Sequence, residues 1–341
     1  MNLRQGAVTV VGLVLVLLLT LAILTPNPFE SARLLAVGAF GGEIGITRTL
    51  VKWIPLTLAG LGVVVAWRGG MYNIGGEGQF VVGGIAGAFA AKPILEAAPG
   101  WFVAAPLILA AATLAGAAWG WIAAWLFVRR GVEVVISTIL MNFVAIQMLA
   151  YLVSGPMRER SGKLPQTDRL PDASALPKFD PRFDLHYGIA LALVAVALVY
   201  VFLYLTKQGF QLRLVGENAR AARANRISAP RGRLLAMAVS GGLCGLAGGV
   251  EYMGVTQQLG QGFSQNWGFL AIPVALLAGL HPIAVCLSAL YFAAILAGSR
   301  NLAGFTADGT VLIYIVQAAA VLGLVALGKY KGKAAQPMEA A

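Results

Sequence analysis

The feature that most constrains this chain is a series of long apolar runs separated by charged loops. The first extends from Gly6 to Leu24 without a charged residue. A run of about 18 or more apolar residues can cross the hydrocarbon core of a bilayer as a helix. Hydrophobic residues make up 59% of the chain and charged residues 11%, which is more apolar surface than one soluble core could bury. The sequence therefore predicts an all-α membrane protein that crosses the bilayer many times.

The apolar runs predict about ten transmembrane helices, some short or broken, in a single domain that covers residues 1–341. We interpret the first run as a retained anchor and not as a cleaved signal peptide, because it is long and no Ala-x-Ala-like site precedes Pro26. Residues 31–49 are expected at the outer membrane interface. The other expected spans are 52–67, an interrupted span within 68–92, 101–128, 134–153, 187–206, 234–253, two short spans within 269–298 that meet at His281-Pro282, and 310–327.

The distribution of charge fixes the expected orientation in the membrane. The segment from Lys207 to Arg233 has seven cations against one acid, Glu217, and cations beside apolar spans mark the cytoplasmic side. Arg129, Arg130 and the C-terminal lysines fall on the same side, which places both termini in the cytoplasm. The Pro-rich loop 154–186 has six cations and five acids, so we expect it to be extracytoplasmic. The net charge of +11 thus reflects topology, and nucleic acid is not an expected partner.

A glycine-rich stretch from Arg68 to Lys92 carries three polar side chains, Asn73, Glu77 and Gln79. Glycines permit close backbone approach and non-helical dihedrals, and a carboxylate at membrane depth is costly unless it is paired or faces water. We therefore expect a broken or tightly packed start to this helix. In one interpretation the three residues line a solute pathway or its inner gate. In the other they form a structural polar knot, in which Glu77 accepts backbone N–H bonds or pairs with Arg68.

Uncharged polar residues elsewhere are further candidates for the pathway. Asn142 and Gln147 lie within the span 134–153, where they either bridge helices or face a cavity. The bend at 255–268 is expected outside the membrane, and its amides and aromatic rings suit a neutral, hydrogen-bonding solute such as a sugar or nucleoside. An ordinary polar loop is the alternative. The candidates in this bend are Gln257, Gln261, Phe263, Asn266 and Trp267.

Motifs for catalysis or metal binding are absent from the sequence. It has no G-x-x-x-x-G-K-[ST] phosphate loop, no H-E-x-x-H and no G-x-S-x-G turn. Cys244 and Cys286 lie in apolar runs without metal-ligand spacing, and His186 is expected at the surface of the external loop. We therefore expect no catalytic residue, no bound metal and no cofactor in this chain.

The basic segment also predicts a short helix. VGENARAARANRISAPRGR combines an Asn that can cap a helix, an Ala/Arg run of about ten residues from Ala219, and a Pro that ends it. A helix with Ala on one face and Arg on another favours a docking surface for a cytoplasmic partner. A simple positive-inside loop is the alternative.

Two motifs resemble a known family. GENARAARANRIS followed by SGGLCGLAGGV is similar to the G-x-N-x-x-A-A-x-x-x-G-I … S-G-x-x-x-G-L-A-G pattern of permease subunits of ABC importers for ribose-like sugars, branched-chain amino acids and nucleosides. YNIGGEGQFVVGG resembles the N-I-G-x-E-G-Q pattern of its nucleoside and simple-sugar branch, to which the last span DGTVLIYIVQA is also similar. The resemblance extends from about Ile54 to Val325. One departure is Asn225-Arg226-Ile227, where the family usually has Gly before Ile.

The resemblance implies a permease that carries a nucleoside or related small polar solute by alternating access across a bacterial cytoplasmic membrane. It implies a second, similar permease as dimer partner, an ATPase with two nucleotide-binding units that holds ATP and Mg²⁺, and an extracytoplasmic solute-binding lipoprotein. Carried onto this chain, it places the segment 207–233 in a groove of the ATPase. Arg220 and Arg223 would steer docking, and the contact residues would be Gly216, Asn218, Ala221 and Ala222.

Other functions stay open at this point. Within the family, a simple sugar or a branched-chain amino acid is the alternative solute. An ion-coupled secondary transporter would need an intramembrane carboxylate, for which Glu77, Glu133 and Glu251 are candidates. A membrane-integral enzyme is disfavoured, because the sequence has no convergent set of catalytic side chains.

Overall fold

The computed structural model describes residues 27–97, 100–180 and 182–303, with a few isolated positions outside these ranges. Over these residues the regular structure is helical, and the only β-type pairing there is two isolated bridges. Seven helices of the described part are long and apolar enough to cross a membrane. The expected anchor at 6–24 lies largely outside the described residues, as does the expected last span at 310–327. The all-α, multi-pass class is therefore confirmed, and the count of ten spans stays a prediction.

The helices follow most of the expected apolar runs. Their bounds in chain order are α2 (Pro28–Phe40), α3 (Gly42–Arg68), α4 (Gly76–Ala97), α5 (Trp101–Arg130), α6 (Val134–Ser154), α7 (Gly188–Leu205), α8 (Lys207–Glu217), α9 (Ala219–Ala224), α10 (Ala229–Glu251), α11 (Trp267–Leu277) and α12 (Pro282–Ala303). A short 3₁₀ turn, η1 (Asp172–Ser174), lies in the loop 155–187, and a π-helical turn, η2 (Tyr252–Thr256), extends α10.

Several elements differ from the expectation, among them α10, which begins at Ala229 and not at 234, with Pro230 in its first turn. Helix α3 begins at Gly42, before the expected start at 52, and Gly42 itself has a left-handed φ of +69° that separates α3 from α2. The run 269–298 gives a short α11 of 11 residues and a full-length α12 of 22 residues, where two short spans were expected. Helix α11 is too short to cross a bilayer, which needs about 20 residues. Helix α9 has six residues and not ten, and α8 precedes it.

Contacts divide the chain into two units, one of residues 1–49 with 290–341 and one of residues 50–289. In the first unit, α2 packs on the C-terminal part of α12. A Cβ added at Gly38 would lie 2.8 Å from the Cα of Gly298, so the two helices touch through their backbones there. Leu35 and Ile295 are buried in the same contact.

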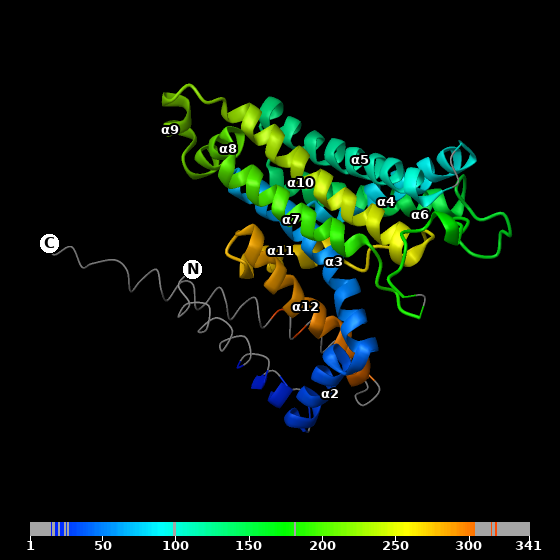
Figure 1. Ribbon diagram of the computed structural model, residues 1–341. Coiled ribbons are helices and arrows are strands. Elements are labelled where there is room, and N and C mark those ends of the chain that lie inside the picture. The colour runs from blue at the N-terminus through cyan, green and yellow to red at the C-terminus, as the bar shows by residue number, and fades with distance from the viewer. Residues whose placement is uncertain are drawn as a thin grey trace. The chain divides into compact units, whose positions relative to one another are not determined.

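The core of the second unit is the packing of α10 against α4 and α5, which lie side by side in Figure 1. The glycines of SGGLCGLAGGV allow this approach. A Cβ added at Gly241 would lie 2.2 Å from the carbonyl oxygen of Gly116 on α5, and a Cβ added at Gly248 would lie 2.0 Å from the carbonyl oxygen of Phe80 on α4. Helix α10 therefore packs against both neighbours with its backbone, as closely packed transmembrane helices do.

The two polar parts of the second unit lie at opposite ends of its helices. Figure 1 shows the loop 155–187 at one end and the corner formed by α8 and α9 at the other. Helix α7 runs from the loop to α8, and α10 returns from the corner toward η2. A near-neutral loop and a basic corner at opposite helix ends agree with the expected charge asymmetry of a membrane protein.

Candidate functional site

The polar residues of the glycine-rich stretch meet inside the second unit. Residues 69–75 form a non-helical connection between α3 and α4, which confirms the predicted break. The side chain of Asn73 is fully buried, and its amide nitrogen donates to Gln79 Oε1 at 2.9 Å and to Ser240 Oγ of α10 at 2.9 Å. Its oxygen accepts from the backbone N–H of Gly75 at 2.8 Å. The Asn73 side chain thus joins the start of α4 to α10.

The N-terminus of α4 is capped from another helix. The side-chain oxygen of Asn142, on α6, accepts from the backbone N–H of Gly78 at 2.8 Å, and its nitrogen donates to the carbonyl oxygen of Ile74 at 2.9 Å. The first turn of a helix leaves N–H groups without partners, and inside a membrane no water can satisfy them. Asn142 is therefore a helix-bridging residue, which was one of the two predicted roles.

The N-terminus of α11 is capped by a carboxylate. Glu77 Oε2 accepts from the backbone N–H of Gly268 at 2.8 Å, and Glu77 Oε1 accepts from the hydroxyl of Ser264. Asn266, the residue directly before α11, has a left-handed φ of +65°, and its side chain does not cap the helix. A negative group at a helix N-terminus complements the helix dipole. Glu77 therefore supplies the cap that α11 lacks.

The two capped helix ends touch each other. A Cβ added at Gly268 would lie 2.1 Å from the backbone nitrogen of Glu77 and 2.3 Å from the carbonyl carbon of Gly76. This contact joins the starts of α4 and α11, two helices that both begin in the interior of the second unit. Interrupted helices of this kind commonly frame solute sites in transporters, with their N-termini directed at an anion. Here the group at the N-terminus of α11 is a side chain of the same protein, Glu77.

These contacts match the predicted polar knot. Glu77 accepts a backbone N–H bond, as one interpretation expected, but it does not pair with Arg68. The guanidinium of Arg68 donates instead to the carbonyl oxygens of Leu280 at 2.9 Å and Gly279 at 3.3 Å. Ser264 and Gly268 were not predicted as partners of Glu77, because the residues around them form no motif that indicates a contact with residue 77.

The segment that follows α10 is held by the loop 155–187. Backbone N–H groups of Thr167, Leu170 and Leu176 donate to carbonyl oxygens of Leu259, Gln257 and Met253 at 2.8, 2.7 and 3.0 Å. Arg169 adds two hydrogen bonds, from Nε at 2.8 Å and from Nη2 at 2.6 Å, to the side-chain oxygen of the buried Gln257. The loop thus forms a cover over residues 253–259.

His186 lies inside this cover, and the expectation that it is a surface residue is wrong. Its side chain is 1% exposed and its ring lies between Gly188 and Gly254, where an added Cβ would come within 2.6 Å of ring atoms. The backbone N–H of Gly188 donates to Nδ1 at 3.1 Å. Burial lowers the pKa of the imidazole from 6.5 to about 4, with a further contribution from Lys178. The two glycines leave room for the ring. Gly188 is two positions from His186, but Gly254 belongs to a distant part of the chain, and no sequence pattern links it to His186.

The predicted pathway residues fall into two groups. Asn73, Glu77, Gln79 and Asn142 lie together and are buried, as are Gln257, Phe263 and Trp267. Gln261 and Asn266 are exposed in the segment 257–266, and Gln147 is exposed on α6 beside Phe143 and Val144. Burial and exposure alone do not show which of these residues contact a solute. Their assignment to a pathway stays a prediction.

Trp267 takes part in a second buried cluster that the sequence did not indicate. Lys52 Nζ of α3 lies over the Trp267 ring at 5.3 Å from its centroid, and Glu251 at the end of α10 is 4% exposed. A cation over an indole face is an attractive contact. Among the described residues, no group of three His, Cys, Asp or Glu is placed to hold a metal ion.

The corner of α8, α9 and α10 forms the other candidate site. Asn218 caps α9, because its side-chain oxygen accepts from the backbone N–H groups of Arg220 and Ala221 at 3.0 Å each. Ala222 is fully buried with Val215 and Ala229, whereas Arg220 and Arg223 are exposed. The surface that α9 offers is therefore its arginine face, and Ala222 holds the corner together from within.

Two backbone contacts fix this corner. A Cβ added at Gly216 would lie 2.1 Å from the carbonyl oxygen of Arg68, so α8 touches the end of α3 directly. At the end of α9, the backbone N–H of Arg226 donates to the carbonyl oxygen of Arg223 at 2.9 Å, and that of Ile227 donates to the carbonyl oxygen of Ala222 at 2.9 Å. This pair of bonds is the Schellman motif, in which the residue at the position of Arg226 is usually Gly.

Arg226 has a left-handed φ of +58°. The Gly that the family pattern has before Ile is therefore explained by geometry, since Gly adopts this conformation without steric cost. Arg226 stands where the family pattern has Gly, but the backbone conformation is the same as the Schellman motif requires. The two hydrogen bonds of the motif are formed, and Ala222 is buried against Ile227.

Comparisons with known proteins match most of the chain. The family model described as branched-chain amino acid transport system / permease component matches residues 45–327. The glucose ABC transporter permease protein TsgB13 of Haloferax volcanii is 33% identical to the chain, over 89% of this chain and 82% of the relative. The guanosine ABC transporter permease protein NupP of Bacillus subtilis is 32% identical, over 78% and 76%. A second guanosine permease protein of Bacillus subtilis, NupQ, is 27% identical, over 86% and 94%. No solved structure matches the chain.

Proposed function

We propose a function on the premise that the chain belongs to the family of branched-chain amino acid transport system permease components, which the match over residues 45–327 shows. The resemblance predicted from the two motifs is confirmed. The chain is a permease subunit of an ABC importer and a multi-pass membrane protein. It is the membrane part of a transporter and not an ATPase.

The proposed solute is a nucleoside or a simple sugar. The observation that carries this proposal is the similarity, over most of the chain, to permeases whose names give guanosine and glucose as the solute. Of the predicted pathway residues, Gln261 and Asn266 are the proposed solute contacts, because they are exposed and their amides can both donate and accept hydrogen bonds. The amides of Asn73 and Gln79 bond to each other, so their proposed role is to shape the pathway wall.

The proposed assembly has four kinds of subunit. A second permease would pair with this chain, which is supported by the two guanosine permease proteins, NupP and NupQ, of Bacillus subtilis. An ATPase with two nucleotide-binding units would hold ATP and Mg²⁺, and a solute-binding lipoprotein would deliver solute. The proposed location is the cytoplasmic membrane of a bacterium, with ten spans and both termini in the cytoplasm. The balanced charge of the loop 155–187, at the helix end opposite the basic corner, supports an external position for that loop.

The proposed mechanism is alternating access driven from the α8–α9 corner. When ATP closes the ATPase pair, the α9 helices of the two permeases would move together and the pathway would open toward the binding protein. Arg220 and Arg223 would steer the docking, since they are exposed and carry positive charge. The contact between Gly216 and Arg68 gives a route by which α8 passes this movement to α3.

The test of coupling uses the complete transporter in reconstituted vesicles. Ala221→Asp, a half-buried site on α9, should abolish solute uptake and solute-stimulated ATP hydrolysis while the chain still inserts. Ala222→Asp should do the same and also lower the stability of the corner, because it places a charge in a fully buried position. Ala173→Asp, in the exposed loop, is the control and should leave both activities unchanged. Normal coupling in Ala221→Asp would refute the docking role of α9.

The test of solute class measures uptake by the same vesicles with the binding lipoprotein present. Labelled guanosine and labelled glucose are offered separately, and each unlabelled compound is then used as competitor. Uptake of either one supports the proposal, and the pattern of competition identifies the class. Uptake that is driven by an ion gradient without ATP would contradict the whole assignment.

A further inference from the structure

Helix α11 is held at both ends by the two sides of the break between α3 and α4. At its N-terminus, the backbone N–H of Gly268 donates to Glu77 in the first turn of α4. At its other end, Arg68, the last residue of α3, donates from Nε to the carbonyl oxygen of Leu280 at 2.9 Å and from Nη2 to that of Gly279 at 3.3 Å. The short connection between α3 and α4 therefore joins the two residues that hold α11.

The turn that Arg68 binds is continuous with α11. Gly279 and Leu280 both have a left-handed φ, of +59° and +56°. The backbone N–H of Leu280 donates to the carbonyl oxygen of Ala275 at 3.0 Å, so the turn closes back on the helix. A cation beside the last carbonyl groups of a helix is favourable, because these groups form the negative end of the helix dipole. Within the described residues Arg68 has no acidic partner, so its charge is directed at this helix end.

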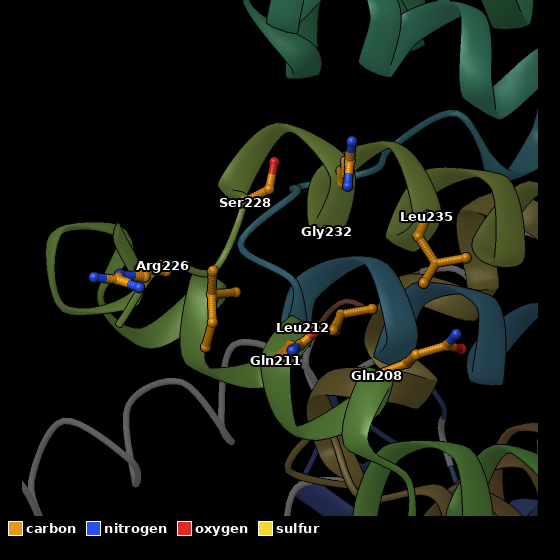
Figure 2. Close-up of a pocket in the computed structure, with 9 residues that line it drawn as sticks. Gln208, Gln211, Leu212, Arg226, Ser228, Gly232 and Leu235 are labelled. Atoms are coloured by element: carbon orange, nitrogen blue, oxygen red, sulfur yellow. The ribbon is translucent and has the colours of Figure 1, made fainter. Parts of the chain in front are cut away.

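The same connection is contacted by α8. A Cβ added at Gly216 would lie 2.1 Å from the carbonyl oxygen of Arg68 and 2.8 Å from the backbone nitrogen of Gly70. Leu212, one turn earlier on α8, packs on Gly69, where an added Cβ would lie 3.3 Å from the Leu212 Cδ2 atom. Figure 2 shows Leu212 beside the blue ribbon in which α3 ends. At Gly216 backbone meets backbone, so this contact cannot yield by a change of rotamer and transmits a displacement.

We propose that Arg68 is a positioning residue that couples movement of the α8–α9 corner to α11. A displacement of α8 moves the end of α3, and the two hydrogen bonds of Arg68 move the turn and α11 with it. Chains of hydrogen bonds and rigid helices are the means by which two distant sites are coupled. Helix α11 begins directly after Asn266, one of the proposed solute contacts, so the movement reaches the solute end of the helix. The inference rests on the proposed function, because it needs the ATPase to move the corner.

A second connection from α8 to the same turn passes through aromatic rings. The guanidinium of Arg213, on α8, lies 4.8 Å from the centroid of the Tyr204 ring, and the centroids of the Tyr204 and His281 rings are 5.5 Å apart. Ring contacts of this kind can slide, whereas hydrogen bonds are directional and weaken steeply when they are bent. The coupling is therefore assigned to Arg68, and a variant at Arg213 distinguishes the two routes.

The test measures hydrogen–deuterium exchange of the complete transporter in lipid nanodiscs, with and without a non-hydrolysable ATP analogue and Mg²⁺. In the wild type we expect the analogue to change exchange both at residues 207–217 of α8 and at residues 278–281 of the turn. Arg68→Met keeps the apolar stem of the side chain and removes every hydrogen-bond donor. This variant should keep the change at α8 and lose the change at the turn. Stimulation of ATP hydrolysis by solute and the binding lipoprotein should be lost with it.

Two further variants separate positioning from stability. Arg68→Lys keeps the positive charge and can donate to the carbonyl groups of the turn, so it should restore the change at residues 278–281. Arg129→Met removes the same group from an exposed position at the end of α5 and should respond as the wild type does. A purely structural role of Arg68 would lower the thermal midpoint of Arg68→Met and leave the response of the turn to the nucleotide in place.

Three results would overturn the inference. A normal response of the turn in Arg68→Met would refute the role of Arg68, and loss of the response in Arg213→Met instead would assign the route to Tyr204 and His281. A wild type in which α8 responds and the turn does not would refute this inference and leave the proposed function intact. A wild type in which α8 itself does not respond would refute the docking role of α9 and this inference together. The wild-type comparison needs no variant, so it decides even if Arg68→Met does not fold.

Discussion

The carboxylate of Glu77 accepts the backbone N–H of Gly268 at 2.8 Å, although the two residues are 191 positions apart in the chain. This bond joins the first turn of α4 to the first turn of α11, and Ser264 donates to the other carboxylate oxygen. A short helix that starts inside a membrane protein needs its N-terminal N–H groups satisfied, since lipid offers no hydrogen bonds. Glu77 meets that need from a different helix, and it is 2% exposed.

Replacing Glu77 with Gln should destabilise the protein more than it changes solute preference. The amide keeps one acceptor oxygen but replaces the other with an NH₂ donor, so the Gly268 N–H and the Ser264 hydroxyl can no longer both donate to it, and a buried polar group that loses its partner costs about 1–3 kcal/mol. We expect a lower thermal midpoint, measured by fluorescence-detected size-exclusion chromatography after heating. Glu96→Gln, an exposed site at the other end of α4, is the control and should be neutral. Altered competition between guanosine and glucose at normal expression would argue for a role of Glu77 in recognition.

Gly268→Ala tests the contact between the two helix ends directly. The new Cβ would lie 2.1 Å from the Glu77 backbone nitrogen, and backbone atoms cannot move aside as a flexible side chain can. We expect a loss of stability of about 1–3 kcal/mol or more, with reduced yield of folded protein. Gly100→Ala, where nothing lies within 4 Å of an added Cβ, should keep the wild-type midpoint. An unchanged midpoint in Gly268→Ala would show that α4 and α11 are not in contact there.

The positions of α5, α6 and α7 could be predicted from the sequence because each apolar run is bounded by charged or polar residues. Helix α5 starts at Trp101 as expected and ends at Arg130, and α6 runs from Val134 to Ser154. The break in the run 269–298 was predicted at His281-Pro282 and lies there, since α11 ends at Leu277 and α12 begins at Pro282. The unequal lengths of the two helices could not be predicted, because the composition on both sides of the break is apolar. The ends of α11 are set by backbone geometry, namely the left-handed Asn266 before it and the left-handed Gly279 and Leu280 after it.

The polar knot could be predicted as a local feature but not as a set of contacts. The glycines around Asn73 and Glu77 indicated a break and a costly carboxylate. The partners of these side chains, Ser240 and Gly268, are distant in the sequence and belong to segments with no matching signal. His186 was misplaced for the same reason, since its burial depends on Gly254 in another part of the chain.

Arg226→Gly should stabilise the α9 corner. Arg226 occupies the left-handed position of the Schellman motif with φ +58°, where a side chain costs about 1 kcal/mol and Gly does not. We expect a thermal midpoint slightly above wild type, measured in detergent. Asn225→Gly is the control, because Asn225 has an ordinary φ of −88° and its side chain donates to Ala221. Asn225→Gly should lower the thermal midpoint. A higher midpoint in both variants would show that the left-handed φ of Arg226 is not the cause of the stabilisation.

Acid should loosen the loop 155–187 through His186. Burial holds the pKa of the folded imidazole at about 4, below its ordinary value of 6.5, so the unfolded or opened loop takes up a proton first as the pH falls. The stability contributed by the neutral ring is therefore fully present above about pH 6.5 and is lost as the pH falls toward 4. The difference corresponds to roughly 3 kcal/mol at most. Two carboxylates of the loop titrate in a lower pH window. Hydrogen bonds donated by Arg182 keep the pKa of Asp180 below its usual value, and those donated by Ser161 and Gln166 lower the pKa of Glu159 to about 2.

The measurement is hydrogen–deuterium exchange of residues 165–187 between pH 7 and pH 4.5, corrected for the intrinsic effect of pH on exchange. We expect protection of the Leu170 and Leu176 amides, which donate to Gln257 and Met253, to fall within this window. His186→Gln should be less protected at pH 7 and should show no further loss down to pH 4.5, because the glutamine side chain does not titrate. His281→Gln, which changes the histidine directly before α12, should keep the wild-type transition. Protection in His186→Gln that still falls between pH 6.5 and 4.5 would assign the transition to another group and refute the role of the buried imidazole.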